Sequence, residues 1–242
     1  MYPWTAFCLA AAAWVATIWT YHAWVSANPH RNALLRLPGI SCLNVCPDWQ
    51  HCKHLGCDAY FYGFVLAYFT DYLMQCDPDT NCDELFVKLR QQYDDLGTTH
   101  RLPALRIEMT HATPFPRLKA TSSAIAHLGQ PLLAVYEQLY DKRKQEDRHI
   151  RWALKASVDM EDLLHQHRGE YRLPKAARDK LTKRCEDYLA HITALSNHFH
   201  TQNVALFNST IKSHYLQHMC MMSDSVNPTL TWCYQGEDMM QK

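Results

Sequence analysis

The 242-residue sequence predicts a mainly α-helical protein. At least six segments space their apolar residues with a helical period, and only two short segments, 40–45 and 105–109, have the composition or alternation of strands. Two short strands are too few for a self-contained sheet. We therefore expect a helical bundle that carries at most the remains of an α/β core, in a chain long enough to bury a sizeable apolar interior.

The first segment, residues 6–25, contains no Asp, Glu, Lys or Arg, and the first basic residue of the chain is Arg31. Twenty such residues are long enough to cross a membrane. Alanine dominates the segment, however, and no basic residue precedes it as in a signal peptide. Two interpretations of residues 1–30 stay open: an apolar helix packed on protein, and a membrane anchor.

The remaining helices follow from periodicity. Residues 59–75 are apolar on nearly every face, which is typical of a helix buried on all sides, and Asp77-Pro78-Asp79 ends that pattern. Residues 83–96 are amphipathic. After the break at Pro114-Phe115-Pro116, four further helical patterns cover 119–141, 146–167, 174–200 and 209–222.

Two acidic positions are the candidates for chemistry. Asp48 and His51 have the spacing of a carboxylate and an imidazole that meet where a strand passes into a helix. Glu237 lies in a second acidic element near the other end of the chain. We expect Asp48 and Glu237 to share a site for a hard divalent cation such as Mg²⁺, although two carboxylates alone hold such an ion weakly.

Zinc is the less favoured metal. Four of the ten cysteines fall within residues 42–57, but their spacing lacks the paired C-x2-C pattern of common zinc modules. Buried free thiols are the first interpretation, and a zinc module that adds His51 or His54 is the alternative. His214 and His218 are also spaced to share one helix face, either as zinc ligands or as a packed pair.

The chain has 24 basic and 24 acidic residues, so any surface for a polyanion must be local. Residues 142–187 hold 13 Lys or Arg against 9 Asp or Glu. Lys and Arg contact nucleic-acid backbones without regard to sequence, and a solvated helix face is the alternative. The predicted nucleic-acid contacts are Lys142, Arg143, Lys144, Arg148 and Arg151.

The order of these motifs resembles the C-terminal part of eukaryotic cut-and-paste transposases with an RNase H-like core, in particular the Kyakuja-Dileera-Zisupton and Plavaka-like groups. Their D-x-x-H step followed by Leu-Gly is similar to Asp48, His51 and Leu55-Gly56. Their P-K-x-H-x-L-x-H stretch is similar to residues 210–218, with Ile at position 211 where the pattern has Pro. Glu237 falls where the last catalytic acid begins the final helix.

The resemblance implies an organisation and an activity. Residues 31–115 would be a partial RNase H-like core, 116–222 a helical insertion, and 223–242 a segment carrying the last acid. The activity would be Mg²⁺-dependent cleavage and transfer of DNA strands in the nucleus, with Asp48 and Glu237 as metal ligands and His51 beside them, in a chain that binds DNA and copies of itself.

No Asp precedes Asp48, so the first catalytic acid of such enzymes has no counterpart in this sequence. The resemblance therefore implies a truncated piece that is inactive alone. The alternative from a different class is a non-enzymatic helical interaction protein, anchored at a membrane through residues 6–25.

Overall fold

The computed structural model describes residues 47–110 and 115–232. The chain divides after Cys46 into two units, and every described residue belongs to the second unit, Pro47–Lys242. The apolar segment 6–25, the predicted strand 40–45 and Glu237 lie outside the described residues.

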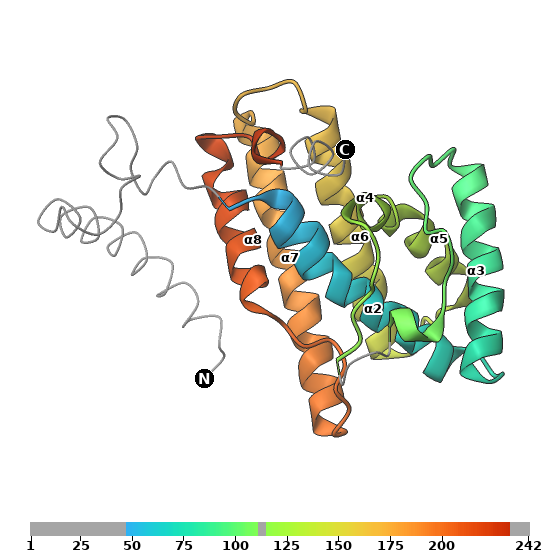
Figure 1. The fold of residues 1–242 in the computed structure, drawn as a ribbon. Coiled ribbons are helices and arrows are strands. Elements are labelled where there is room, and N and C mark those ends of the chain that lie inside the picture. Colours follow the sequence, from blue (N-terminus) through green and yellow to red (C-terminus); the bar gives the residue numbers. More distant parts are fainter. Residues whose placement is uncertain (1–46, 111–114, 233–242) are drawn as a thin grey trace, which may run out of the picture. The chain divides into compact units, whose positions relative to one another are not determined.

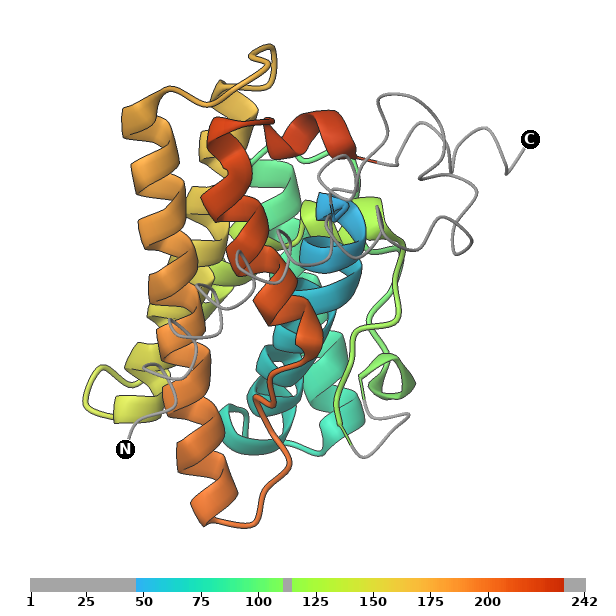
Figure 2. The same ribbon diagram turned by 90° about the vertical axis from the view of Figure 1, so that its left-hand side faces the viewer.

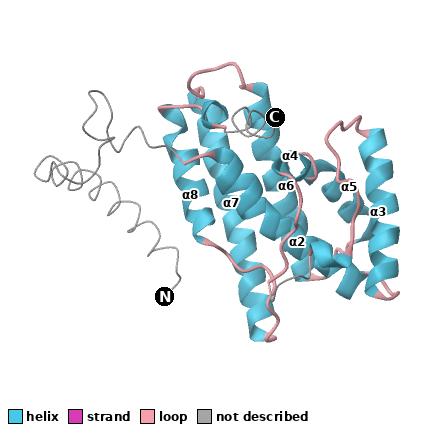
Figure 3. Cartoon of the chain, viewed as in Figure 1, coloured by secondary structure: helices cyan, strands magenta, loops and turns pink. Residues whose placement is uncertain are grey.

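The described residues form helices and turns, with no strand among them (Figure 3). The prediction of a mainly α fold is confirmed for this part of the chain. In chain order the elements are η3 (Gln50–Asp58), α2 (Ala59–Tyr68), η4 (Phe69–Leu73), α3 (Pro78–Asp95), η5 (Ile107–Met109), α4 (Ser122–Ala126), α5 (Gly129–Leu139), α6 (Gln145–Gln166), α7 (Lys175–Thr201), α8 (Ile211–Met221), η6 (Met222–Asp224) and η7 (Pro228–Thr231).

The predicted strand at 105–109 is wrong. Ile107–Met109 is the short helical turn η5, in which the Met109 amide donates to the Arg106 carbonyl at 2.9 Å and the Thr110 amide to the Ile107 carbonyl at 3.1 Å. The alternation of apolar and polar residues arises because a surface loop inserts Leu105 into the core and leaves Arg106 in solvent. Alternation without a neighbouring strand does not make a sheet.

The helical pattern of 119–141 contains two helices. Thr121 caps α4 by accepting a bond from the Ala124 amide at 3.3 Å, and the chain turns at His127 before α5 begins. Pro131 lies in the first turn of α5, where a missing amide proton costs nothing. When the apolar residues of two successive helices continue one helical period, the periodicity hardly shows the break between them.

Helices α6 and α7 pack along each other at the centre of the bundle (Figure 1). α5 packs on α6 and α3 on α5, while α8 packs on α7 at the other side. The continuous run formed by η3 and α2 crosses this array, so that α8 lies between α7 and η3 (Figure 2).

The buried run depends on a glycine at a close approach. A Cβ at Gly63 would lie 2.6 Å from the Leu118 nitrogen and 2.8 Å from the Arg117 Cα. The loop before α4 therefore rests directly on α2, where the Leu118 amide donates to the Ala59 carbonyl at 2.8 Å. This approach closes the core over η3 and α2.

Candidate functional site

Asp48 caps the helical run that begins at Trp49. Its Oδ1 accepts a bond from the Gln50 amide at 3.1 Å, and its Oδ2 accepts one from the His51 amide at 3.0 Å. Aspartate at this position satisfies amides that have no partner inside the helix. Asp48 is mostly covered, with 14% of its side chain exposed.

The structure brings Asp48 and His51 together, as their spacing predicts. His51 Nδ1 contacts Asp48 Oδ2, and the imidazole is half exposed. The carboxylate is thus oriented by two amides and one ring, and the ring is the partner that solvent can reach. Among the described residues, Asp48 stands where a loop passes into a helix. The segment before it, which was expected to be a strand, lies outside the described residues.

A second predicted segment, 210–218, lies directly beside this one. A Cβ at Gly56 would lie 3.0 Å from the Lys212 Cβ, and Cys57 Sγ lies 3.9 Å from Ser213 Oγ, a residue 156 positions later. Burial raises the pKa of the Cys52 thiol, while the nearby Lys212 ammonium acts to lower it. Two motifs that are distant in the sequence therefore share one face of the bundle.

His214 and His218 form a packed pair on α8. Their Nε2 atoms are 2.9 Å apart, and their rings are perpendicular with centroids 4.2 Å apart. His218 is buried, and burial together with the neighbouring His214 lowers its pKa. One ring nitrogen donates to the other, which is the arrangement of a satisfied histidine pair.

The predicted DNA contacts lie at the far end of α6. Arg143 bonds to Asp141 and Arg151 to Glu137 at 2.6 Å, and the exposed members of the set are Lys142, Arg143, Lys144 and Arg148. From Gln145 to Glu161, which contacts Trp49, a helix rises about 24 Å. The basic segment and Asp48 thus belong to different ends of the bundle.

The largest polar constellation of the described residues was not predicted. Lys53, on η3, is fully buried, and its Nζ lies 2.6 Å from Asp58 Oδ2, 2.8 Å from Ser157 Oγ and 3.4 Å from Glu161 Oε1. Burial acts against the charge of Lys53, but Asp58 and Glu161 outweigh it and raise its pKa. The ammonium therefore stays protonated inside the protein.

Further hydrogen bonds reach the two carboxylates of this buried ion cluster, which consists of Lys53, Asp58 and Glu161. Glu161 Oε1 accepts from Trp49 Nε1 and contacts His54 Nε2, both at 3.0 Å, while Ser157 donates to Asp58 Oδ1 at 3.2 Å. Burial acts to raise the pKa of Glu161, but His54 and Lys53 prevail and lower it to about 2. Burial raises the pKa of Asp58 against the attraction of Lys53.

The buried ion cluster has the ligand types of a metal site but already contains a cation. One ligand atom from each of His54, Asp58 and Glu161 lies within 4.8 Å of the others. The Lys53 ammonium lies among them and neutralises the charge that a metal would neutralise. Lys53 and Asp58 are fully buried and Glu161 is 22% exposed, and the ion pairs hold η3 against α6.

Sequence reasoning missed the buried ion cluster because its members come from two distant segments. The available signal was the presence of polar residues in apolar helices. Lys53 and Asp58 stand in a buried helical run, and Ser157 and Glu161 stand one turn apart on α6. Charged residues are almost never fully buried unless they are paired, so charged residues in two buried segments indicate that the two segments pair with each other.

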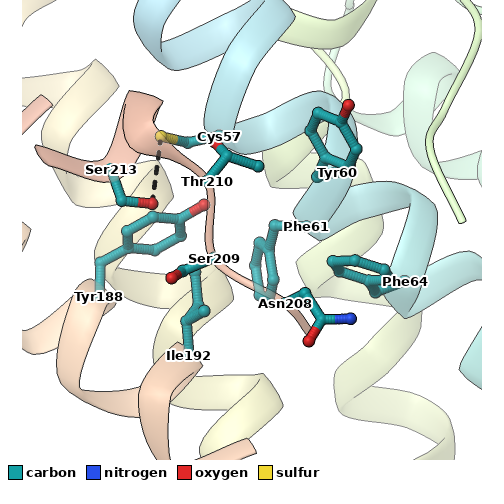
Figure 4. A pocket seen from close by; sticks show the side chains of 10 residues that line it. All are labelled: Cys57, Tyr60, Phe61, Phe64, Tyr188, Ile192, Asn208, Ser209, Thr210 and Ser213. Atoms are coloured by element: carbon teal, nitrogen blue, oxygen red, sulfur yellow. Dashed lines mark hydrogen bonds between the residues drawn. The ribbon is translucent and has the colours of Figure 1, made fainter. Parts of the chain in front are cut away.

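A small open hollow lies between α2, α7 and the chain that enters α8 (Figure 4). Four of its ten lining residues are aromatic, and Cys57 supplies a thiol. Burial raises the pKa of Cys57, so the sulfur is a thiol at neutral pH and not a nucleophilic thiolate. The lining residues are Cys57, Tyr60, Phe61, Phe64, Tyr188, Ile192, Asn208, Ser209, Thr210 and Ser213.

The zinc alternative concerns a cluster of which Cys52 and Cys57 are described. Both are buried free thiols, which is the first interpretation of these two positions, and burial raises the pKa of each. His54, offered as a further zinc ligand, contacts Glu161. Cys42 and Cys46 lie outside the described residues.

Comparison of the chain with family models, with curated proteins and with solved structures found no match. Within residues 47–110 and 115–232, no helix combines the length and the apolar character needed to cross a membrane. The function therefore has to be argued from the geometry.

Proposed function

We propose that the chain derives from an RNase H-like transposase and is related to metal-dependent cleavage and transfer of DNA strands. One observation carries the proposal: the segments 48–56 and 210–218, which carry its two best motifs, pack side by side although they are far apart in the sequence. Chance motifs in unrelated helices have no reason to meet. The RNase H-like core itself and the nuclear location are parts of the same proposal.

Asp48 and Glu237 are the metal ligands in this proposal, and Mg²⁺ is the ion. Asp48 is suited to this role because two amides fix its carboxylate while an exposed imidazole lies against the same oxygen. A cation that approaches from solvent exchanges with the His51 ring and leaves the capping bonds in place. When bound, Mg²⁺ supplies the positive charge that stabilises the phosphodiester during cleavage.

The proposal is tested by Mn²⁺ binding to the whole chain, followed by electron paramagnetic resonance. Asp48→Asn and Glu237→Gln should each weaken binding at least about tenfold, since a site with so few carboxylates depends on every one. Asp77→Asn is the matched control, because Asp77 caps α3 in the same way and accepts the Thr80 amide at 3.1 Å. Equal affinities in Asp48→Asn and Asp77→Asn would refute the assignment.

The second candidate is a non-enzymatic helical interaction protein. The observation that favours it is the burial of Lys53 and Asp58, whose ion pair stabilises the packing of η3 against α6. On this hypothesis Asp48 is only a helix cap. Asp48→Asn and Asp77→Asn should then reduce stability alike and leave Mn²⁺ binding unchanged.

A further inference from the structure

Two histidines face each other where α6 packs against α7. His149 Nδ1 and His191 Nδ1 are 2.9 Å apart, and the ring centroids are 5.1 Å apart at an interplanar angle of 53°. Both side chains are partly exposed. The residues are 42 positions apart and come from the two longest helices of the described chain, so tertiary packing and not local spacing brings them together.

The distance between the two nitrogens fits shared ligation. Zinc binds imidazole nitrogen at about 2.0–2.1 Å, and tetrahedral geometry then separates two ligand nitrogens by roughly 3.3 Å. The observed separation reaches this value through a small rotation of either ring. In the metal-free pair, one Nδ1 carries a proton that the other accepts, and a metal ion takes the place of that proton.

The two rings also have the protonation state that ligation needs. Burial lowers the pKa of His149, and Arg148 and His198 lower it further. Burial and the neighbouring His149 lower the pKa of His191. Neutral imidazoles bind metal without first losing a proton to solvent.

Hard cations have less reason to bind here. Asp187, one turn before His191 on α7, already bonds to Lys183 Nζ at 2.6 Å and to Arg184 at 3.2 Å. The pair therefore presents nitrogen donors, which suit zinc, nickel and copper and not magnesium. This separates it from the carboxylate site at Asp48.

We propose that His149 and His191 form a two-imidazole site for a divalent transition-metal ion of the Zn²⁺, Ni²⁺ or Cu²⁺ class. Water completes the coordination, since both side chains are partly exposed. A bound ion links the first half of α6 to the second half of α7. The site is independent of the proposed transposase function, because none of its residues belongs to the DNA-cleavage motifs.

The test is a titration of the whole chain with Zn²⁺ by calorimetry, combined with thermal unfolding. We expect one ion per chain, an affinity at least about tenfold weaker in His149→Gln and in His191→Gln, and a Zn²⁺-dependent rise in Tm that both variants lose. Any change of Tm with Mg²⁺ should be the same in the wild-type chain and in both variants, because the two histidines do not bind that ion. Glutamine keeps a hydrogen-bonding group at a partly exposed position, so folding is preserved and is checked by circular dichroism.

His214→Gln is the matched control, since His214 also belongs to a close histidine pair, but its partner His218 is buried and leaves no room for water to complete the coordination. It should bind Zn²⁺ like the wild-type chain. The proposal is overturned if the double variant His149→Gln/His191→Gln retains wild-type affinity, or if only His214→Gln loses it.

Discussion

The two ends of the segment 48–58 use similar chemistry for different purposes. At the outer end, Asp48 contacts His51, and half of the imidazole is exposed to solvent. At the inner end, Asp58 contacts Lys53, and both side chains are buried. Solvent, and with it a cation or a nucleic acid, can reach the outer pair, whereas the inner pair is buried and stabilises the fold. Burial, more than residue type, decides what an ionisable pair can do.

The largest effect should follow from removing the buried cation. Lys53→Met leaves Asp58 and Glu161 without their ammonium, and loss of one partner of a buried ion pair costs about 3–5 kcal/mol. Urea unfolding of the variant and the wild-type chain measures the loss. The control is Lys155→Met, because Lys155 Nζ pairs with Asp159 on the same helix while 45% of its side chain is exposed. That change should cost less than about 1 kcal/mol, and equal losses would contradict the comparison.

The next effect concerns pH. The folded pKa of Glu161 is about 2, below its ordinary value of 4.5, so its charge contributes stability that is fully present above pH 4.5 and is lost as the pH falls toward 2. This contribution is on the order of 3 kcal/mol at neutral pH. Glu161→Gln removes it, and the difference in unfolding free energy between the wild-type chain and this variant should shrink as the pH falls. A difference independent of pH would show that the charge of Glu161 is not what stabilises the cluster.

Asp58 cannot produce the same trend, because burial raises its pKa. Its titration shifts the pH dependence in the opposite direction, and it is present in both proteins. Glu161 is one of the charges that raise the pKa of Asp58, so the comparison of the wild-type chain with Glu161→Gln reports Glu161 together with its effect on Asp58.

A smaller loss is expected at the outer end. Asp48→Ala removes a helix cap, which costs about 1 kcal/mol. Chemical unfolding should place it well below Lys53→Met and close to Asp77→Ala, the corresponding cap of α3. A loss of unfolding free energy as large as that of Lys53→Met would mean that Asp48 also stabilises the core.

These contrasts explain how much the sequence could predict. The helices from Pro78–Asp95 to Ile211–Met221 follow from periods that neighbouring residues define, and Asp48 meets His51 because three positions separate them. The bond between Lys53 and Ser157 joins residues 104 positions apart, and no local pattern encodes it. The turn at 105–109 is the opposite case, in which a local pattern is present but does not decide the structure. An alternating pattern forms a strand only when a partner strand exists.

The smallest effect should appear at the basic segment, far along α6 from the outer end. If the exposed Lys142 and Arg148 bind phosphates, replacing each by Ala should weaken DNA binding and reduce the slope of log K against log salt by about 0.9 for each phosphate that is no longer neutralised. Fluorescence anisotropy over a series of salt concentrations measures both quantities. Arg90→Ala is the matched control, because Arg90 is an exposed basic residue on α3, outside the basic segment. A basic segment that is only a solvated helix face should show the same slope in all three variants, because side chains that do not meet DNA release no counterions from it.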